Sequence, residues 1–156
     1  MTTTTAQHHN AKRLARLAAV QALYQMTLMP RPAAQIIKEF QSDPQALLQE
    51  TGADGASPEV DHVLFGAIVT GVTANTDELD GMIAGAFDSK AAAERLEILL
   101  RAILRAGVFE LHHQGAIPTG VIINDYVDVT HAFFADREPG LVNGILDKLA
   151  KSLRAA

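Results

Sequence analysis

Three basic residues near the start of the chain, Lys12, Arg13 and Arg16, have the types and spacing needed to bind an anion. On a helix of about 3.6 residues per turn they fall within about 100° of arc, beside an apolar stripe. The N-terminus of a helix also favours negative charge through its N–H groups and its dipole. The spacing therefore predicts phosphate contact. A solvated helix face explains three cations equally simply, and that alternative stays open.

Two further features of the sequence have both a structural and a functional interpretation. Lys148, Lys151 and Arg154 recur every three residues, which suits the C-terminal end of a helix dipole and also fits a second strip of phosphate contacts. Tyr24 lies at the edge of the apolar stripe, where it either stacks on an unpaired base or packs in the core.

The paired histidines, His8-His9 and His112-His113, suggest a metal site at first sight. Adjacent residues on a helix point in different directions, and neither pair has the four-residue spacing of helical ligand sets. The sequence therefore predicts no metal site. It also contains no Gly-rich phosphate loop, no Gly-x-Ser-x-Gly turn and no His-Glu-x-x-His helix, so we expect neither an enzyme nor a cofactor.

The charges of the 156-residue chain are unevenly distributed around a net charge of −5. Residues before Glu39 include five basic side chains and no acid, whereas residues 39–88 include ten acids and no Lys or Arg. Such a chain can offer a basic face to an anion and an acidic face to a cationic partner. The absence of cysteine, of a signal segment and of a long apolar span favours a cytoplasmic protein that crosses no membrane.

Helical periodicity dominates the rest of the chain, so these residues are expected on an all-α scaffold of six or seven helices. Residues 1–9 are predicted to be a disordered leader, and residues 10–156 a single domain. The expected helices cover residues 9–29, 33–51, 57–74, 91–113, 119–134 and a final segment ending near 153. An interruption near Asp43-Pro44 and a new helix after Asn75 are left open. The first helix is expected to bury a stripe of Leu14, Leu17, Ala18, Gln21, Tyr24 and Leu28.

Five segments resemble the NusB family in their order along the chain: RLARLAAVQALYQ (13–25), AILRAGVFEL (102–111), IP (117–118), VIIND (121–125) and LVNGILDK (141–148). The resemblance extends over about residues 12–153. It implies a compact bundle in two packed subdomains, a first helix that contacts boxA leader RNA, and a heterodimer with the ribosomal protein NusE. It also implies assembly with RNA polymerase and other Nus factors on ribosomal RNA operons, hence a role in transcription antitermination.

The resemblance also implies which residues take part. The expected RNA-binding residues are Lys12, Arg13, Arg16, Gln21, Tyr24, Asp136, Leu141, Asn143 and Lys148, the later ones in or after a second RNA-facing loop at 136–143. The expected partner-facing residues are Asp80, Glu97 and Arg101. Leu14, Leu100, Arg137 and Gly140 depart from the residues of many relatives. Leu14 replaces a further arginine, so we expect weak affinity for RNA alone.

Two other functions remain as alternatives. One is a helical adaptor that binds protein without RNA. The other is a domain related to the RNA-binding part of an RNA cytosine methyltransferase, although the length leaves no room for a cofactor-binding Rossmann unit. The sequence leaves open whether the protein forms a homodimer.

Overall fold

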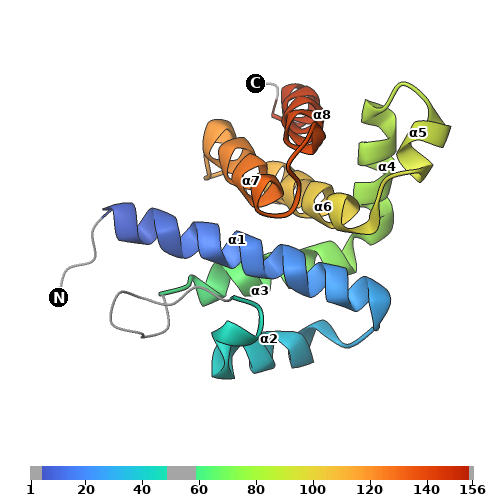
Figure 1. Ribbon diagram of the computed structural model, residues 1–156. Coiled ribbons are helices and arrows are strands. Elements are labelled where there is room, and N and C mark those ends of the chain that lie inside the picture. The colour runs from blue at the N-terminus through green and yellow to red at the C-terminus, as the bar shows by residue number, and fades with distance from the viewer. Residues whose placement is uncertain (1–4, 49–58, 155–156) are drawn as a thin grey trace. The chain divides into compact units, whose positions relative to one another are not determined.

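The computed structural model describes residues 5–48 and 59–154, which form eight α-helices and one 3-10 helix (Figure 1). These residues include no β-strand, so the predicted all-α fold is confirmed. The chain divides into two compact units, Met1–Thr70 (unit 1) and Gly71–Ala156 (unit 2). No helix in the described ranges combines the length and apolar character that a membrane span requires.

Helix α1, Thr5–Leu28, opens unit 1 and begins four residues before the expected start. Residues 5–9 are therefore helical rather than a disordered leader, and residues 1–4 of that predicted leader lie outside the described residues. Every residue from Leu14 to Val20 is buried. A helix that is buried around its whole circumference needs mostly apolar residues, and six of these seven are alanine, leucine or valine, with Arg16 as the exception. Leu28, predicted in the core, is 55% exposed.

Unit 1 continues with α2, Ala33–Ser42, and the 3-10 helix η1, Pro44–Ala46. The break at Asp43 confirms the interruption that Pro44 suggested, because proline disfavours helical backbone in the residue before it. The Phe40 ring stacks on Phe65 of α3, His62–Ala74, with centroids 4.0 Å apart. This aromatic pair joins α2 to α3. Residues 49–58, including the expected turn at 52–57, lie outside the described residues.

Asp61 sets the beginning of α3. Ser57 and Pro58, the expected start, lie outside the described residues, and Glu59 precedes the helix without belonging to it. The Asp61 carboxylate accepts a hydrogen bond from the Leu64 backbone N–H at 2.9 Å, as an N-cap residue does. Its own backbone N–H donates to the Ala11 carbonyl at 3.1 Å. The same residue therefore starts α3 and ties it to α1.

Unit 2 contains two interruptions that fix its first helices. A new helix, α4, Thr76–Ala86, follows Asn75, whose side-chain amide donates back to the Gly71 carbonyl at 2.8 Å. The predicted continuous helix over 91–113 is wrong: α5, Lys90–Glu94, and α6, Ile98–His113, are separate. The Glu97 carboxylate accepts from the Leu99 N–H at 3.1 Å, so it caps a fresh N-terminus.

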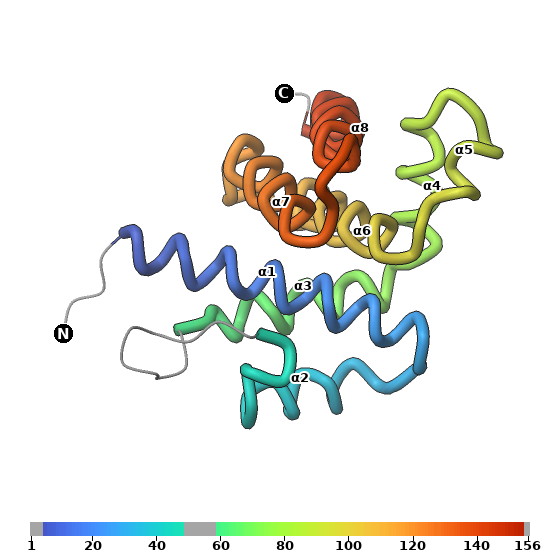
Figure 2. The backbone as a smooth tube through the Cα atoms, viewed as in Figure 1, coloured from blue at the N-terminus to red at the C-terminus, as the bar shows by residue number. Residues whose placement is uncertain are grey.

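Helix α6 is the central helix of unit 2. It packs against α4, against α7, Thr119–Phe133, and against α8, Glu138–Leu153, and Figure 2 traces these segments. Gly107 permits the close approach of α8, because an added Cβ would lie 2.9 Å from Leu146 Cδ1. Since α8 begins at Glu138, the expected loop at 136–143 is mostly helix.

Arg154 closes unit 2 by binding the end of α6. Its guanidinium donates hydrogen bonds to the carbonyls of Glu110, Leu111, Gln114 and Ile117 and to the Thr119 hydroxyl, at 2.5–3.2 Å. Carbonyls in the last turn of a helix have no partner within the helix. Arg154 therefore acts as a side-chain cap for α6 and for the turn that leads into α7, which gives this residue a structural role.

Candidate functional site

Lys12 is paired with an acid rather than isolated. Its ammonium lies 2.9 Å from Asp61 Oδ2, and the two side chains are 44% and 25% exposed. Burial alone would raise the pKa of Asp61, but hydrogen bonds from the Leu64 N–H and the Lys12 ammonium, with the charge of Lys12, outweigh burial and lower it. The carboxylate thus stays charged at neutral pH and offsets part of the Lys12 charge.

Arg13 and Arg16 differ sharply although they are three residues apart. Arg13 is partly exposed and donates to Asn10 Oδ1 from Nε at 3.3 Å and from Nη2 at 3.1 Å. Arg16 is 0% exposed and ranks among the largest fully buried side chains. The prediction of a single surface patch is therefore wrong for Arg16, because α1 is buried around its whole circumference there. Of the two arginines, Arg13 has the surface that a phosphate can reach.

The hollow beside Lys12 has mixed charge. It has a volume of about 360 Å³ and is lined by His8, Ala11, Lys12, Glu59, Val60 and Asp61. Further along α1, Gln21 and Tyr24 are both half-buried. Tyr24 therefore keeps part of its surface accessible, and neither residue belongs fully to the core stripe that the sequence predicted.

The remaining expected RNA-binding residues lie in unit 2. Asp136, Leu141, Asn143 and Lys148 are all exposed, the last three on α8. Lys148 also has a structural contact, because its ammonium donates to the Ala86 carbonyl at the end of α4, 3.2 Å away. Three of these four residues thus share one helix, with Leu141 and Asn143 in its N-terminal half and Lys148 in its C-terminal half. Their roles in RNA binding stay predictions.

A groove in unit 2 adjoins these residues. It has a volume of about 450 Å³ and is lined by Phe87, Ala92, Arg95, Leu96, Glu97, Leu100, Arg137, Glu138 and Leu141. Apolar side chains thus meet charged residues of both signs along one depression. The sequence could not reveal this groove, since its walls come from two segments that lie at least 37 residues apart in the chain.

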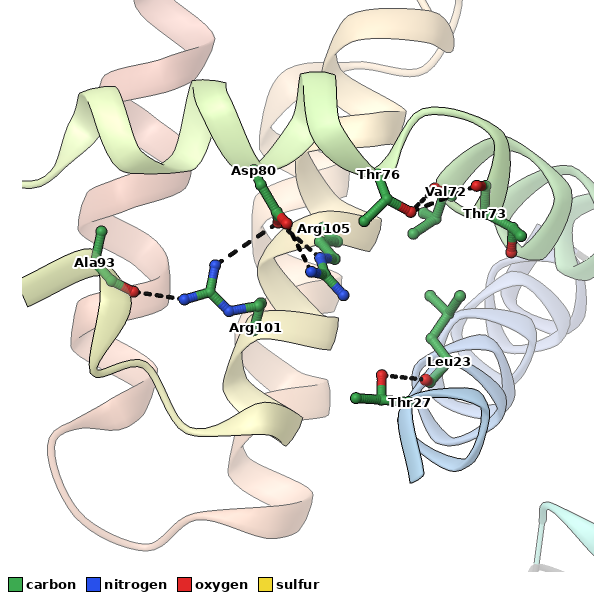
Figure 3. A network of polar contacts seen from close by, with 9 residues as sticks. All are labelled: Leu23, Thr27, Val72, Thr73, Thr76, Asp80, Ala93, Arg101 and Arg105. Carbon is green, nitrogen blue, oxygen red and sulfur yellow. Dashed lines mark hydrogen bonds and ion pairs between the residues drawn. The ribbon is translucent and has the colours of Figure 1, made fainter. Parts of the chain in front are cut away.

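Two of the expected partner-facing residues, Asp80 and Arg101, belong to an internal charge cluster (Figure 3). Arg105 and Asp80 form a bidentate pair. Arg105 Nε donates to Asp80 Oδ1, and Arg105 Nη2 donates to Asp80 Oδ2, each at 2.7 Å. Arg101 Nη1 lies 3.7 Å from Asp80, and its Nη2 donates to the Ala93 carbonyl at 2.5 Å. The cluster joins α4 to α6 and to α5. Arg105 was not among the residues expected at this site. Its four-residue spacing from Arg101, which places both on one face of a helix, was the signal that could have identified it.

The third expected partner-facing residue, Glu97, is exposed and lines the groove while it caps α6. Among the acids that were expected to attract a cationic partner, Glu39 is paired with Arg31 of the same unit. The hydrogen bond from Arg31, with its charge, lowers the pKa of Glu39. Several acids of the 39–88 segment are thus bound within their own unit.

One group of described side chains has the composition of a metal site. Glu78 of α4 joins His112 and His113 at the end of α6, with one ligand atom from each within 4.8 Å of the others. All three side chains are exposed. The sequence argument treated the histidine pair alone and could not foresee Glu78, which lies 34 residues earlier.

Comparisons with known proteins agree on one family. The sequence model described as the NusB family matches residues 13–151. The transcription antitermination protein NusB of Sphingopyxis alaskensis is 44% identical over 140 residues, which cover 90% of this chain and 92% of that protein. The protein of the same name from Rhizobium etli strain CIAT 652 is 44% identical over 147 residues, covering 94% and 89%.

Solved structures share the fold. T. maritima NusB is 25% identical with a TM-score of 0.64, and the match covers 89% of each chain. A crystal structure of the antitermination factors NusB and NusE in complex with dsRNA contains a chain that is 21% identical, with a TM-score of 0.72 over 96% of this chain and 99% of that one.

The described helices define an all-α protein, and the relatives matched over about nine-tenths of the chain carry the name of a transcription antitermination protein. The chain belongs to the NusB family. The resemblance seen in the sequence is thereby confirmed.

Proposed function

We propose that this protein is a transcription antitermination factor that binds boxA leader RNA together with the ribosomal protein NusE. The observation that carries the proposal is the match to the NusB family over residues 13–151, with relatives that bear the antitermination name at 44% identity. These relatives are matched over about nine-tenths of their length. This favours an antitermination factor over a methyltransferase-related domain.

Arg13 is the residue of α1 that best fits an RNA contact. It combines a permanent charge with a partly exposed side chain in the third turn of α1, and a guanidinium makes charge-assisted hydrogen bonds to phosphate. Lys12 contributes less, because Asp61 offsets its charge. Tyr24 and Gln21 add a ring for base stacking and an amide for hydrogen bonding. Arg16 acts by holding α1 in place.

For the protein partner we propose the groove of unit 2 that Glu97 lines. Apolar side chains such as Leu96, Leu100 and Leu141 supply the surface to be buried, and Glu97 supplies an exposed negative charge at its edge. This combination suits an apolar segment flanked by a cation, as a basic ribosomal protein offers. Asp80 and Arg101 support this surface from within the unit.

The test is equilibrium binding of boxA RNA at several salt concentrations, with and without NusE, for wild type and Arg13→Ala. We expect NusE to tighten RNA binding. Loss of one phosphate contact should weaken binding by about 5-fold and reduce the slope of log K against log salt by about 0.7. Lys38→Ala is the matched control. Lys38 is exposed on α2, so this substitution removes one positive charge elsewhere in unit 1.

A second pair of variants tests the partner surface. Glu97→Gln keeps an acceptor for the Leu99 N–H and removes only the charge, so NusE binding should weaken several-fold while α6 stays capped. Glu94→Gln on α5 is the control. Binding of NusE without any RNA binding would favour the protein-only adaptor, and binding of neither would overturn the proposal.

The wider assembly belongs to the same proposal. We infer that the RNA-bound protein acts in the cytoplasm with RNA polymerase and other Nus factors on ribosomal RNA operons.

Self-association into a homodimer would compete with this role if it covered Arg13. Sedimentation velocity over a range of protein concentrations tests it, and a single monomeric species at all concentrations would remove self-association from the scheme.

A further inference from the structure

We propose that Glu78, His112 and His113 form a binding site for a divalent transition-metal ion, with Zn²⁺ as the best fit. The three side chains come from the first turns of α4 and the last turn of α6, both in unit 2. Two imidazoles and one carboxylate are a recurrent zinc ligand set, and Zn²⁺ accepts nitrogen and oxygen donors together. None of the three residues belongs to the proposed RNA or NusE contacts.

The geometry is already close to that of a bound ion. His112 Nε2 lies 3.2 Å from Glu78 Oε1, and the His112 and His113 ring centroids are 4.5 Å apart with the planes at 76°. Ligand atoms bound at about 2.1 Å to one tetrahedral ion lie roughly 3.4 Å from one another. His112 and Glu78 meet this requirement, and a side-chain rotation of the exposed His113 brings in the third donor.

The position of His113 is supported by its neighbours in unit 2. Its ring stacks on Phe109, with centroids 5.0 Å apart and the planes at 25°. Phe109 is in turn fixed against Gly71, where an added Cβ would lie only 2.1 Å from Phe109 Cε1. The absence of a side chain at Gly71 therefore lets Phe109 lie flat and hold the His113 ring beside His112. The stacking keeps the His113 ring close to the other two ligands, and the exposed ring retains the rotation that its donor atom needs to reach the ion.

The local field also favours a cation. His112 and His113 end α6, where the helix dipole is negative, and Glu78 adds a full negative charge. The Glu78 carboxylate lies 3.2 Å from His112 Nε2, so its negative charge would face an ion bound by that imidazole. Three protein ligands leave a coordination position for water or for a donor from a second molecule.

The test is calorimetric titration of the full chain with Zn²⁺ alone. We expect saturable binding of one ion at this site, weakened more than about tenfold in His113→Gln and in Glu78→Gln. Both variants retain polar side chains at exposed positions, and circular dichroism checks that each stays folded. Bound Zn²⁺ should also raise the thermal midpoint of wild type and of neither variant.

Two control variants make the assignment specific. His131→Gln removes an exposed histidine elsewhere in unit 2, and the double variant His8→Gln, His9→Gln removes the other adjacent pair. Both should leave the affinity of the site unchanged. Absence of saturable binding in wild type would overturn the proposal, as would binding that disappears in the His8, His9 variant and persists in His113→Gln. RNA and NusE binding is measured separately, so either proposal can fail without the other.

Discussion

At the start of α1 an arginine lies partly exposed beside a neutral amide, whereas between α4 and α6 two arginines converge on one carboxylate. Arg13 donates to Asn10, but Arg105 makes a bidentate pair with Asp80, and Arg101 joins it. A guanidinium held at 2.7 Å by both carboxylate oxygens has its charge matched within the fold. The comparison teaches that exposure, more than residue type, separates candidate ligand contacts from structural ones.

Arg16→Ala should have the largest effect on stability and tests whether Arg16 belongs with the structural arginines. Removing this fully buried side chain leaves a cavity and should cost about 3 kcal/mol of unfolding free energy in urea denaturation. Arg16→Met, which keeps most of the volume, should recover part of the loss. A variant as stable as wild type but weak in RNA binding would move Arg16 to the ligand-binding group.

Asp80→Ala should come next, with a loss of about 2 kcal/mol. The Asp80 side chain is 30% exposed and that of Arg105 19%, so the pair is mostly buried and Arg105 would be left without its carboxylate. A double-mutant cycle with Arg105→Ala measures the coupling between them. Asp88→Ala, at an exposed position of the same unit, is the control. Zero coupling would contradict a structural role for the cluster.

Asp61→Asn should produce a smaller loss, about 1 kcal/mol at pH 7, that depends on pH. The folded state lowers the pKa of Asp61 below its ordinary value of 3.8, so the unfolded chain takes up the proton first as pH falls. The carboxylate therefore stabilises the fold above about pH 4, and this contribution disappears as pH drops through the lower, folded pKa. Urea denaturation of both proteins from pH 3 to pH 7, roughly the range over which this linkage acts, should show the difference shrinking at acid pH. A pH-independent difference would contradict it.

Arg13→Ala should have the smallest effect on stability, below about 0.5 kcal/mol, because its side chain is partly exposed and its hydrogen bonds to Asn10 are local. The same substitution is the one expected to weaken RNA binding. Chemical denaturation measured on the sample used for RNA binding sharpens the comparison. A large loss of stability would place Arg13 with Arg101 and Arg105.

Much of the fold was predictable because its signals are local. Helix type followed from periodicity, and proline marked the break at Asp43-Pro44. The break before α6 was missed, since a leucine-rich pattern from 91 to 113 hides the capping role of Glu97, which depends on the path of the chain. The start of α3 was missed for a similar reason: the helix was expected from residue 57, whereas Asp61 caps a helix that begins at His62.

The candidate site was less predictable, because it depends on burial and on distant partners. A helical wheel placed Arg16 beside Lys12 and Arg13 but could not show that α1 is covered on all sides at that point. Partners 49 residues apart, such as Lys12 and Asp61, or 25 apart, such as Asp80 and Arg105, leave no local signal. The resemblance to a family supplied candidate residues, and the fold separated the accessible ones from the buried ones.

The cap that Arg154 forms also has a consequence for biosynthesis. The carbonyls that it binds belong to residues 37–44 positions earlier in the chain. At a synthesis rate of about 5–20 residues per second, the end of α6 is made roughly 2–9 seconds before its cap exists. During translation the nascent α6 therefore waits with its last turn uncapped, and unit 2 reaches its final form only when the ribosome has delivered α8.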